Sequence, residues 1–414
     1  MAWILSINTM AIYAIRSLYF PKFRNLMYTH TLLSTAFWLQ QIVVGWLVYD
    51  ETNSPLLTSL AIGIDTIPIL FLGFIGGSIV DRFNPKKCII FVTVCQFIFI
   101  TSLAAMMYLD LFSIWYIYPI GFFMGIAWVV YEPAKITLGM QLVDKDSIPN
   151  IFGMWICGFN LPRIVSSVLA GYLIVFVGVK FALLVESLII FSAFLSIVLM
   201  DYQHSPSENP NISARKIYTG LKNLIRIIKN SDVLIGFFLL SFIPIFLLLP
   251  STTGLLPDYA SDVLKLDARG LGTLQAFSSI GQIIGIFTIG MLKQNRMGKY
   301  GIWCIYASTF FGTLFAISNI YYLSIIFLMF VNFCIGVFQN ASASIMFTNI
   351  DENYRGRLAG LQISSFGLFI VGTTLSGGLA NLYGPLISTV TSMILIIAIS
   401  SIIIAKYRTI YSHQ

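Results

Sequence analysis

The chain has 414 residues, of which 57% are hydrophobic and 10% are charged, and its mean hydropathy is +0.87. Soluble domains carry about 25% charged residues, so the composition excludes a soluble protein and leaves no room for a soluble catalytic domain. The net charge of +7 comes from basic residues between apolar runs, where they report membrane orientation. We therefore expect an integral membrane protein that is not an enzyme and has no nucleic-acid partner.

Apolar runs bounded by charges, Gly, Pro and Asn predict twelve membrane-spanning helices, because one span needs about 20 apolar residues. The longest polar interval, residues 201–232, divides these spans six and six. The fold class expected is therefore all-α, with two six-helix bundles. The predicted spans are 28–49, 56–80, 88–109, 113–134, 151–178, 181–200, 233–256, 270–292, 301–319, 321–347, 358–380 and 384–405.

The same division predicts five segments along the chain. Residues 201–232 form a central cytoplasmic loop, in which Leu224 and Ile228 belong to an amphipathic helix that lies on the inner leaflet or packs under the bundles. The other segments are an N-terminal interfacial helix or mobile tail (1–27), two bundles (28–200 and 233–406) and a cytoplasmic tail (407–414).

The positions of basic residues predict the orientation of the chain. Of the 24 Lys and Arg residues, all but Arg163, Lys180, Lys265 and Arg269 fall in the termini and loops of one side. By the positive-inside rule both termini lie in the cytoplasm. We expect a multi-pass protein of the bacterial cytoplasmic (inner) membrane.

A repeat of residues supports the division into halves. Duplicated six-span halves that rock about a site at the midplane are typical of transporters. The residues Asp144, Gly153 and Gly171 recur at one constant offset as Asp351, Gly360 and Gly378, and Gly77 and Lys86 recur at a similar offset as Gly290 and Lys299.

The segment Gly73 to Lys87 reads GFIGGSIVDRFNPKK. It resembles the loop between spans two and three of the major facilitator superfamily, G-x-x-x-D-R-x-G-R-[RK], with Asn84 where the family usually has glycine. The resemblance implies that this loop latches the two halves together on the cytoplasmic side in the outward-facing state. The residues that would carry this role are Gly77, Asp81, Arg82, Lys86 and Lys87.

Three further stretches are similar to one branch of that superfamily, the enterobactin-exporter and macrolide-efflux (transmembrane secretion effector) group. They are the first span from Trp38 to Tyr49, the element Glu132 to Lys135, and the turn around Pro257. The branch implies proton-driven export of a siderophore or antibiotic-like molecule. An uptake permease for a metabolite or ferric chelate remains an alternative, because the fold fixes no direction.

Ionisable residues inside membrane spans cost free energy to bury, and they commonly have a function. Asp65 lies about 13 Å from the outer face and Arg163 about 18 Å from the inner face at 1.5 Å per residue. We hypothesise that they share a central cavity in which Asp65 takes up and releases a proton; the alternative is a static pair, or two different neighbours. Glu132 is a third proton-coupling candidate, although a local ion pair with Lys135 explains it equally.

Glu186 and Asp258 lie nearer the outer ends of their spans, where interfacial water reaches them. Aromatic and amide side chains in the spans either line a cavity for a large, partly aromatic molecule or join helices. The cavity candidates are Trp38, Gln41, Tyr131, Asn332 and Gln339, with Gln275 and Gln282 among further amides of the second half.

No cofactor or metal site is indicated. The five cysteines form no C-x-x-C pair, the three histidines are dispersed, and no nucleotide-binding loop occurs. Transport driven by ATP bound to this chain is excluded. The expected partners are a small-molecule substrate, the proton gradient and the lipid bilayer, and we expect a monomer.

Overall fold

The computed structural model describes residues 16–80, 82–202, 214–291 and 296–407. Within these residues the fold is entirely helical, as predicted. Eleven helices are long and apolar enough to span a membrane, and a twelfth span is a pair of helices, Pro55–Gly63 and Thr66–Gly73, bent by 42°. The all-α membrane fold expected from the sequence is confirmed.

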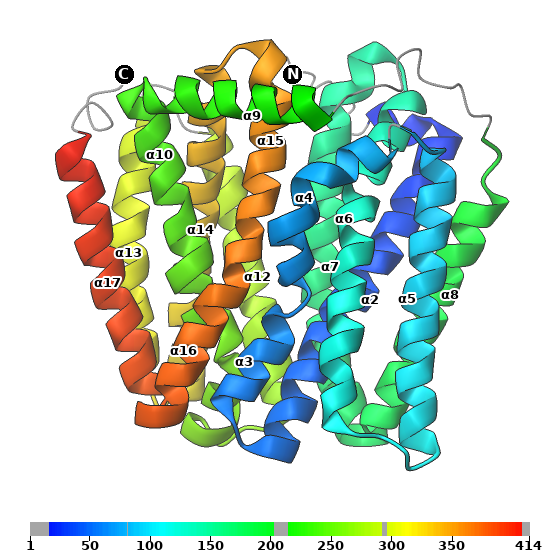
Figure 1. The fold of residues 1–414 in the computed structure, drawn as a ribbon. Coiled ribbons are helices and arrows are strands. Elements are labelled where there is room, and N and C mark those ends of the chain that lie inside the picture. The colour runs from blue at the N-terminus through cyan, green and yellow to red at the C-terminus, as the bar shows by residue number, and fades with distance from the viewer. Residues whose placement is uncertain (1–15, 81, 203–213, 292–295, 408–414) are drawn as a thin grey trace, which may run out of the picture.

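The first six spans occupy one side of the molecule (Figure 1). Proline at the first helical position starts several of them, because it has no N–H to lose there. The helices are α2 (Pro21–Thr52), α3 (Pro55–Gly63), α4 (Thr66–Val80), α5 (Pro85–Tyr108), α6 (Ile117–Gln141), α7 (Ile148–Val177) and α8 (Val179–Leu199).

The first span begins earlier than the predicted residue 28. Helix α2 starts at Pro21, and Phe23 and Leu26 are fully buried in the interior of the first half. The apolar-run criterion missed this turn because Lys22 and Arg24 interrupt the run. Residues 1–15 lie outside the described part of the chain, and so does the proposed interfacial helix there.

The last six spans lie on the other side (Figure 1). Proline again starts α17, while Gly384, at φ +84°, separates it from the preceding helix. The elements are α10 (Asp232–Ile243), α11 (Leu256–Asp258), α12 (Ala268–Met291), α13 (Met297–Ile317), α14 (Tyr321–Thr348), α15 (Glu352–Ser365), α16 (Phe369–Tyr383) and α17 (Pro385–Lys406).

The span that begins with α10 contains wide π-helical turns, η4 (Pro244–Leu248), η5 (Pro250–Gly254) and η6 (Tyr259–Val263). Proline cannot donate to the helical ladder, so it favours such irregular turns. The hydroxyls of Ser251 and Thr252 donate to the freed carbonyls of Leu247 and Leu248. This irregular segment reaches the boundary between the two halves.

Helix α9 (Ala214–Lys229) lies across one end of the molecule, where both ends of the described chain also lie (Figure 1). We name this the α9 end and the opposite one the far end. Leu224 and Ile228 are 0% and 3% exposed within the apolar interior of the second half, whereas Lys222 and Arg226 are exposed. Of the two placements left open by the sequence, packing of the apolar face on the bundle is the one observed.

Glycines bring helices into close contact within each half. A Cβ on Gly125 would collide with the carbonyl of Asp65, and one on Gly285 with the carbonyl of Phe333. The first contact seats α6 against the bend between α3 and α4, and the second seats α12 against α14. The two halves are thus built on the same packing device.

Candidate functional site

Arg163 lies on α7 at the contact with α12 and is only 4% exposed. Its Nη1 donates to Oε1 of Gln282 at 2.7 Å. With the amide of Gln275 oriented so that its oxygen faces the guanidinium, that oxygen accepts from Nη2 at 2.6 Å and from Nε at 2.9 Å. A side chain of the first half is therefore held by two amides of the second half.

The indole of Trp38, on α2, covers the same guanidinium. Arg163 Cζ lies 4.3 Å from the ring centroid, and the Trp38 Nε1 donates to the carbonyl of Phe159 at 3.1 Å, which fixes the ring. A desolvated cation–π contact stabilises by about 2 kcal/mol. The predicted cavity residue Trp38 is thus a direct neighbour of Arg163, which sequence spacing did not indicate.

The amides continue away from Arg163 into the second half. Gln282 donates through Nε2 to Oε1 of Gln339 at 3.2 Å, so Gln339 is linked to the arginine through one residue. Asn332, also predicted for the cavity, is fully buried and donates to the carbonyl of Leu328 on its own helix. Asn332 is therefore not among the residues that contact Arg163.

Asp65 occupies the bend between α3 and α4. Its Oδ2 accepts a hydrogen bond from Nε2 of Gln41 at 3.4 Å, while its buried Oδ1 has no hydrogen-bond partner among the described residues. In this conformation the hydrogen bonds of Arg163 go to Gln275 and Gln282, so the hypothesised direct pair with Asp65 is not formed. Each of the two side chains is instead hydrogen-bonded to glutamine amides.

A cavity of about 30 Å³ is lined by Gln41 and Gln275, which are the hydrogen-bond partners of Asp65 and Arg163. That volume holds one or two waters and is far smaller than the 300–1,000 Å³ typical of ligand pockets. The central region is therefore closed in this conformation. Gln41 and Gln275 both line it, and the full lining is Trp38, Gln41, Ile42, Ile62, Thr253, Leu256, Pro257, Leu271 and Gln275.

Hydrogen bonds join the two halves toward the far end. Tyr49 donates from its hydroxyl to Oδ2 of Asp262 at 2.5 Å, and Ser59 donates to the carbonyl of Gly254 at 3.3 Å. Gly171 of α7 packs directly on Ala268 of α12. The far end is consequently sealed by polar and backbone contacts.

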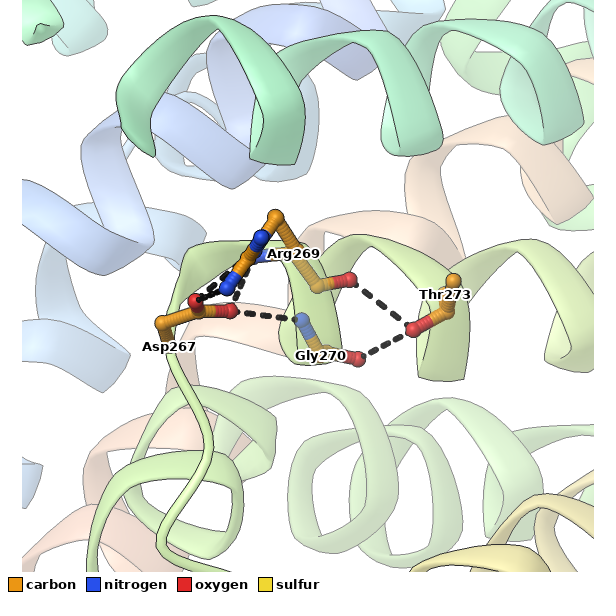
Figure 2. Close-up of polar contacts among 4 residues, drawn as sticks. All are labelled: Asp267, Arg269, Gly270 and Thr273. Carbon is orange, nitrogen blue, oxygen red and sulfur yellow. Dashed lines mark hydrogen bonds and ion pairs between the residues drawn. The ribbon is translucent and has the colours of Figure 1, made fainter. Parts of the chain in front are cut away.

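The start of α12 is fixed next to this seal (Figure 2). Asp267 Oδ1 accepts from the backbone amides of Arg269 at 3.0 Å and Gly270 at 3.3 Å, and its Oδ2 accepts from Arg269 Nε at 2.8 Å. These bonds hold the pKa of Asp267 below its usual range, and the hydrogen bond from the Arg269 side chain contributes most to this shift. The Arg269 guanidinium then lies 5.9 Å from the ring of Phe176 on α7.

The halves diverge toward the α9 end. A Cβ on Gly73 of α4 would lie 2.9 Å from Ser364 Oγ of α15. One turn closer to the α9 end, Gly77 on α4 and Gly360 on α15 have no described atom within 4 Å of the same position. Since residues four apart share a helix face, the gap between the halves opens at this level.

The remaining proton-coupling candidate, Glu132, forms a local ion pair. Lys135 Nζ lies 2.8 Å from Glu132 Oε1, three residues along α6. The same ammonium lies 5.5 Å from the ring centroid of Tyr131 and 5.3 Å from that of Trp155. The local pair that the sequence offered as an alternative is therefore present.

Tyr131 lies in the packed interior of the first half and is fully buried. Its hydroxyl is 3.0 Å from Nδ1 of His30, whose Nε2 is 3.2 Å from the carbonyl of Trp155. Sequence reasoning missed His30. The only signal was a single histidine among apolar residues, which indicates neither a partner nor a face.

The described residues of the motif between α4 and α5 form hydrogen bonds within the first half. Lys86 Nζ donates to the last carbonyls of α8, Val198 at 3.0 Å and Met200 at 2.7 Å. Asn84 caps α5, because its Oδ1 accepts from the amides of Lys86 and Lys87, which explains a residue that departs from the family pattern. Asp81 lies outside the described residues, and the Arg82 side chain is exposed.

The expectation that Glu186 and Asp258 reach interfacial water is wrong. Both are 0% exposed, and neither carboxyl group has a hydrogen-bond partner among the described residues. The error arises because depth along a span was judged without the rotation of the helix.

The sequence matches the family model described as Major Facilitator Superfamily over residues 26–372. A search of curated protein sequences finds no significant relative. The structure resembles that of the nucleoside transporter NupG, with a TM-score of 0.73, 13% identity, and coverage of 94% of this chain and 100% of the other.

Two further solved structures share the fold. The POT family transporter PepTSo has a TM-score of 0.73 at 13% identity, covering 95% of this chain and 99% of that one. A bacterial homolog of the human lysosomal transporter Spinster, inward-facing and unoccupied, has a TM-score of 0.67 at 11% identity, covering 95% and 96%. The match to the family model and the twelve-helix arrangement together show that the chain belongs to the Major Facilitator Superfamily of transporters.

Proposed function

We propose that this alternating-access transporter exports a small organic molecule, of the siderophore or antibiotic-like kind, and is driven by the proton gradient. The observation that carries the proposal is the bonding of Arg163 across the boundary between halves. A buried charge held by both halves must change partners whenever the halves separate there. The hydrogen-bond partners of Arg163 therefore depend on the conformational state of the transporter.

We place the α9 end in the cytoplasm of a bacterial cell, with residues 28–200 and 233–406 moving as two bodies. The distribution of Lys and Arg supports this orientation. In it, the described conformation is closed outside and diverges inside. The motif at Gly77, Arg82 and Lys86 would then latch the halves in the opposite state, which fits its bonding within one half here.

Asp65 is the proposed proton carrier. Among the described residues, its carboxyl group has one buried oxygen without a hydrogen-bond partner and one long bond to Gln41, so an ionised form is poorly compensated in this closed state. A conformation that admits water to the bend between α3 and α4 would favour ionisation. Proton uptake and release would therefore follow the opening and closing of the cavity.

The direction of transport is tested by comparing small molecules in cells and spent medium of a strain lacking the protein and its parent, grown with and without iron. Export predicts a compound that accumulates in the mutant cells, is depleted from their medium and is restored by the intact gene. A compound depleted from the cells but left in the medium would establish uptake instead. Identical profiles would contradict the export proposal under these conditions.

Proton coupling is tested with Asp65→Asn and the matched control Asp50→Asn, which alters an exposed carboxylate on α2. The compound identified above is loaded into cells, and its efflux is followed with and without a protonophore. Asp65→Asn should lose the dependence on the gradient while remaining in the membrane, and the control should keep it. Unchanged gradient dependence in Asp65→Asn would overturn this role.

A further inference from the structure

We infer that the transported molecule is an organic anion whose carboxylate, or a similar planar oxyanion, binds the guanidinium of Arg163. This inference rests on the proposed transport function and adds the chemical class of the substrate. The structural basis is the set of groups around Arg163, which are polar, neutral and drawn from both halves.

Arg163 carries its charge in the interior, and no carboxylate among the described residues forms an ion pair with it. Its Nη1, Nη2 and Nε donate to the neutral oxygens of Gln282 and Gln275. In the described part of the chain, ion pairs are formed by Arg16, Lys22, Lys135, Lys180 and Arg269 but not by Arg163. A buried cation satisfied only by dipoles keeps a strong preference for an anion.

The geometry of the glutamine contacts shows where that anion fits. The Gln275 oxygen accepts from both Nε and Nη2, the edge on which a carboxylate makes two parallel bonds. The amide oxygen therefore occupies, as a neutral substitute, the place of a charged oxygen. Trp38 covers one face of the guanidinium plane. An anion would therefore bind at the edges of the guanidinium, which Gln275 and Gln282 occupy in this conformation.

Asp65 does not supply the missing charge in this state. Its carboxyl group is bonded to Gln41, which lines the cavity together with Gln275. Asp65 and Arg163 are thus each bonded to a different glutamine that lines the same cavity. This cavity must widen before a substrate enters. An anion leaving a cell with a negative interior also moves in the direction that the membrane potential favours.

The test compares benzoate with benzamide, which have nearly the same shape but differ in charge. The purified full-length protein is heated with each compound at equal millimolar concentrations, since a ligand that binds the folded state raises the unfolding temperature. Wild type is compared with Arg163→Gln and with Gln275→Glu, which places a carboxylate of the chain itself at the arginine. Gln141→Glu, an exposed change on α6, is the control.

We expect benzoate, and not benzamide, to raise the unfolding temperature of wild type and of Gln141→Glu. Arg163→Gln and Gln275→Glu should bind benzoate at least about tenfold more weakly; the second variant keeps the arginine and therefore separates loss of the site from loss of folding. Equal shifts for both compounds in wild type, zero included, would overturn the inference. So would benzoate binding that survives in both variants.

Failure of this inference is distinct from failure of the transport proposal. If the strain comparison yields an exported compound that is neutral or cationic at neutral pH, export stands and the anion inference falls. If benzoate binds through Arg163 while the strains have identical profiles, the anion inference stands and the export proposal falls.

Discussion

The two halves of the molecule share a packing scheme but differ in chemistry. Gly125 and Gly285 seat helices in the same way in each half, whereas the charged members of the site, Asp65 and Arg163, both come from the first half. The second half contributes the neutral amides of Gln275 and Gln282, which accept hydrogen bonds from Arg163. Two halves that share a packing scheme can thus form an asymmetric site, in which one half carries the charges and the other provides neutral amide dipoles.

The largest effect is expected from removing the charge. Arg163→Ala should reduce transport by about 30-fold or more, because a buried hydrogen-bonded charge contributes about 2–5 kcal/mol to binding and about 1.4 kcal/mol is tenfold. The measurement is the efflux rate of the compound identified in the strain comparison, with Lys180→Ala as an exposed cation control. Efflux within twofold of wild type would show that transport does not depend on the charge that the first half contributes at Arg163.

The shared scaffold is tested by adding one methyl group in each half. Gly125→Ala and Gly285→Ala should each lower the free energy of unfolding by about 1–3 kcal/mol, because the new Cβ overlaps a neighbouring backbone carbonyl. Gly153→Ala and Gly360→Ala, where no described atom lies nearby, should have little effect. Thermal unfolding of the four variants checks this, and a large loss confined to one half would break the comparison.

The seal at the far end is tested by Tyr49→Phe, which removes the hydrogen bond to Asp262. The far end should open more often, by about fivefold for a bond contributing about 1 kcal/mol. The control is Tyr118→Phe, whose hydroxyl bonds to Leu57 within the first half. The rate at which a cysteine placed near the far end reacts with a soluble thiol reagent reports the change, and equal rates in both variants would contradict the role of Tyr49.

The smallest effect concerns the cap of α12. Because the folded-state pKa of Asp267 is depressed by its bonds to Arg269, its stabilisation is complete above the unfolded pKa of about 3.9 and is lost as the pH falls through the folded value. Asp267→Asn should cost about 0.5 kcal/mol at neutral pH, since the pair is partly exposed. The difference between the unfolding curves of the two proteins should begin to shrink below about pH 4 and vanish only below the folded-state pKa of Asp267. A constant difference would refute this assignment.

The sequence predicted the spans well because apolar length is a local property. Its errors concern the rotation of helices about their axes. Asp258 was expected at interfacial water and is 0% exposed. For Tyr131 the sequence left cavity lining and helix joining open, and its hydroxyl lies 3.0 Å from His30 in the packed interior of the first half.

The partners of Arg163 were beyond sequence reasoning for the same reason. Counting residues along the spans suggested Asp65 at the same depth as Arg163, but depth does not determine which helix a side chain faces. Gln275 and Gln282 lie on α12 and become neighbours only when α7 packs against that helix. Gln275 and Gln282 are seven residues apart, which is close to two helical turns of about 3.6 residues each. That spacing was a signal, because such residues share a helix face.

The central claim is that the halves alternate between closure at the far end and closure at the α9 end. It is tested by distances between spin labels in lipid nanodiscs, with one label pair at Asp110 and Leu382 and another at Lys145 and Lys229, all exposed, after replacement of the five native cysteines. Lowering the pH from neutral, and separately Asp65→Asn, should shift the two distance distributions in opposite directions. Distributions that both stay fixed, or that widen and narrow together, would contradict alternating access governed by this site.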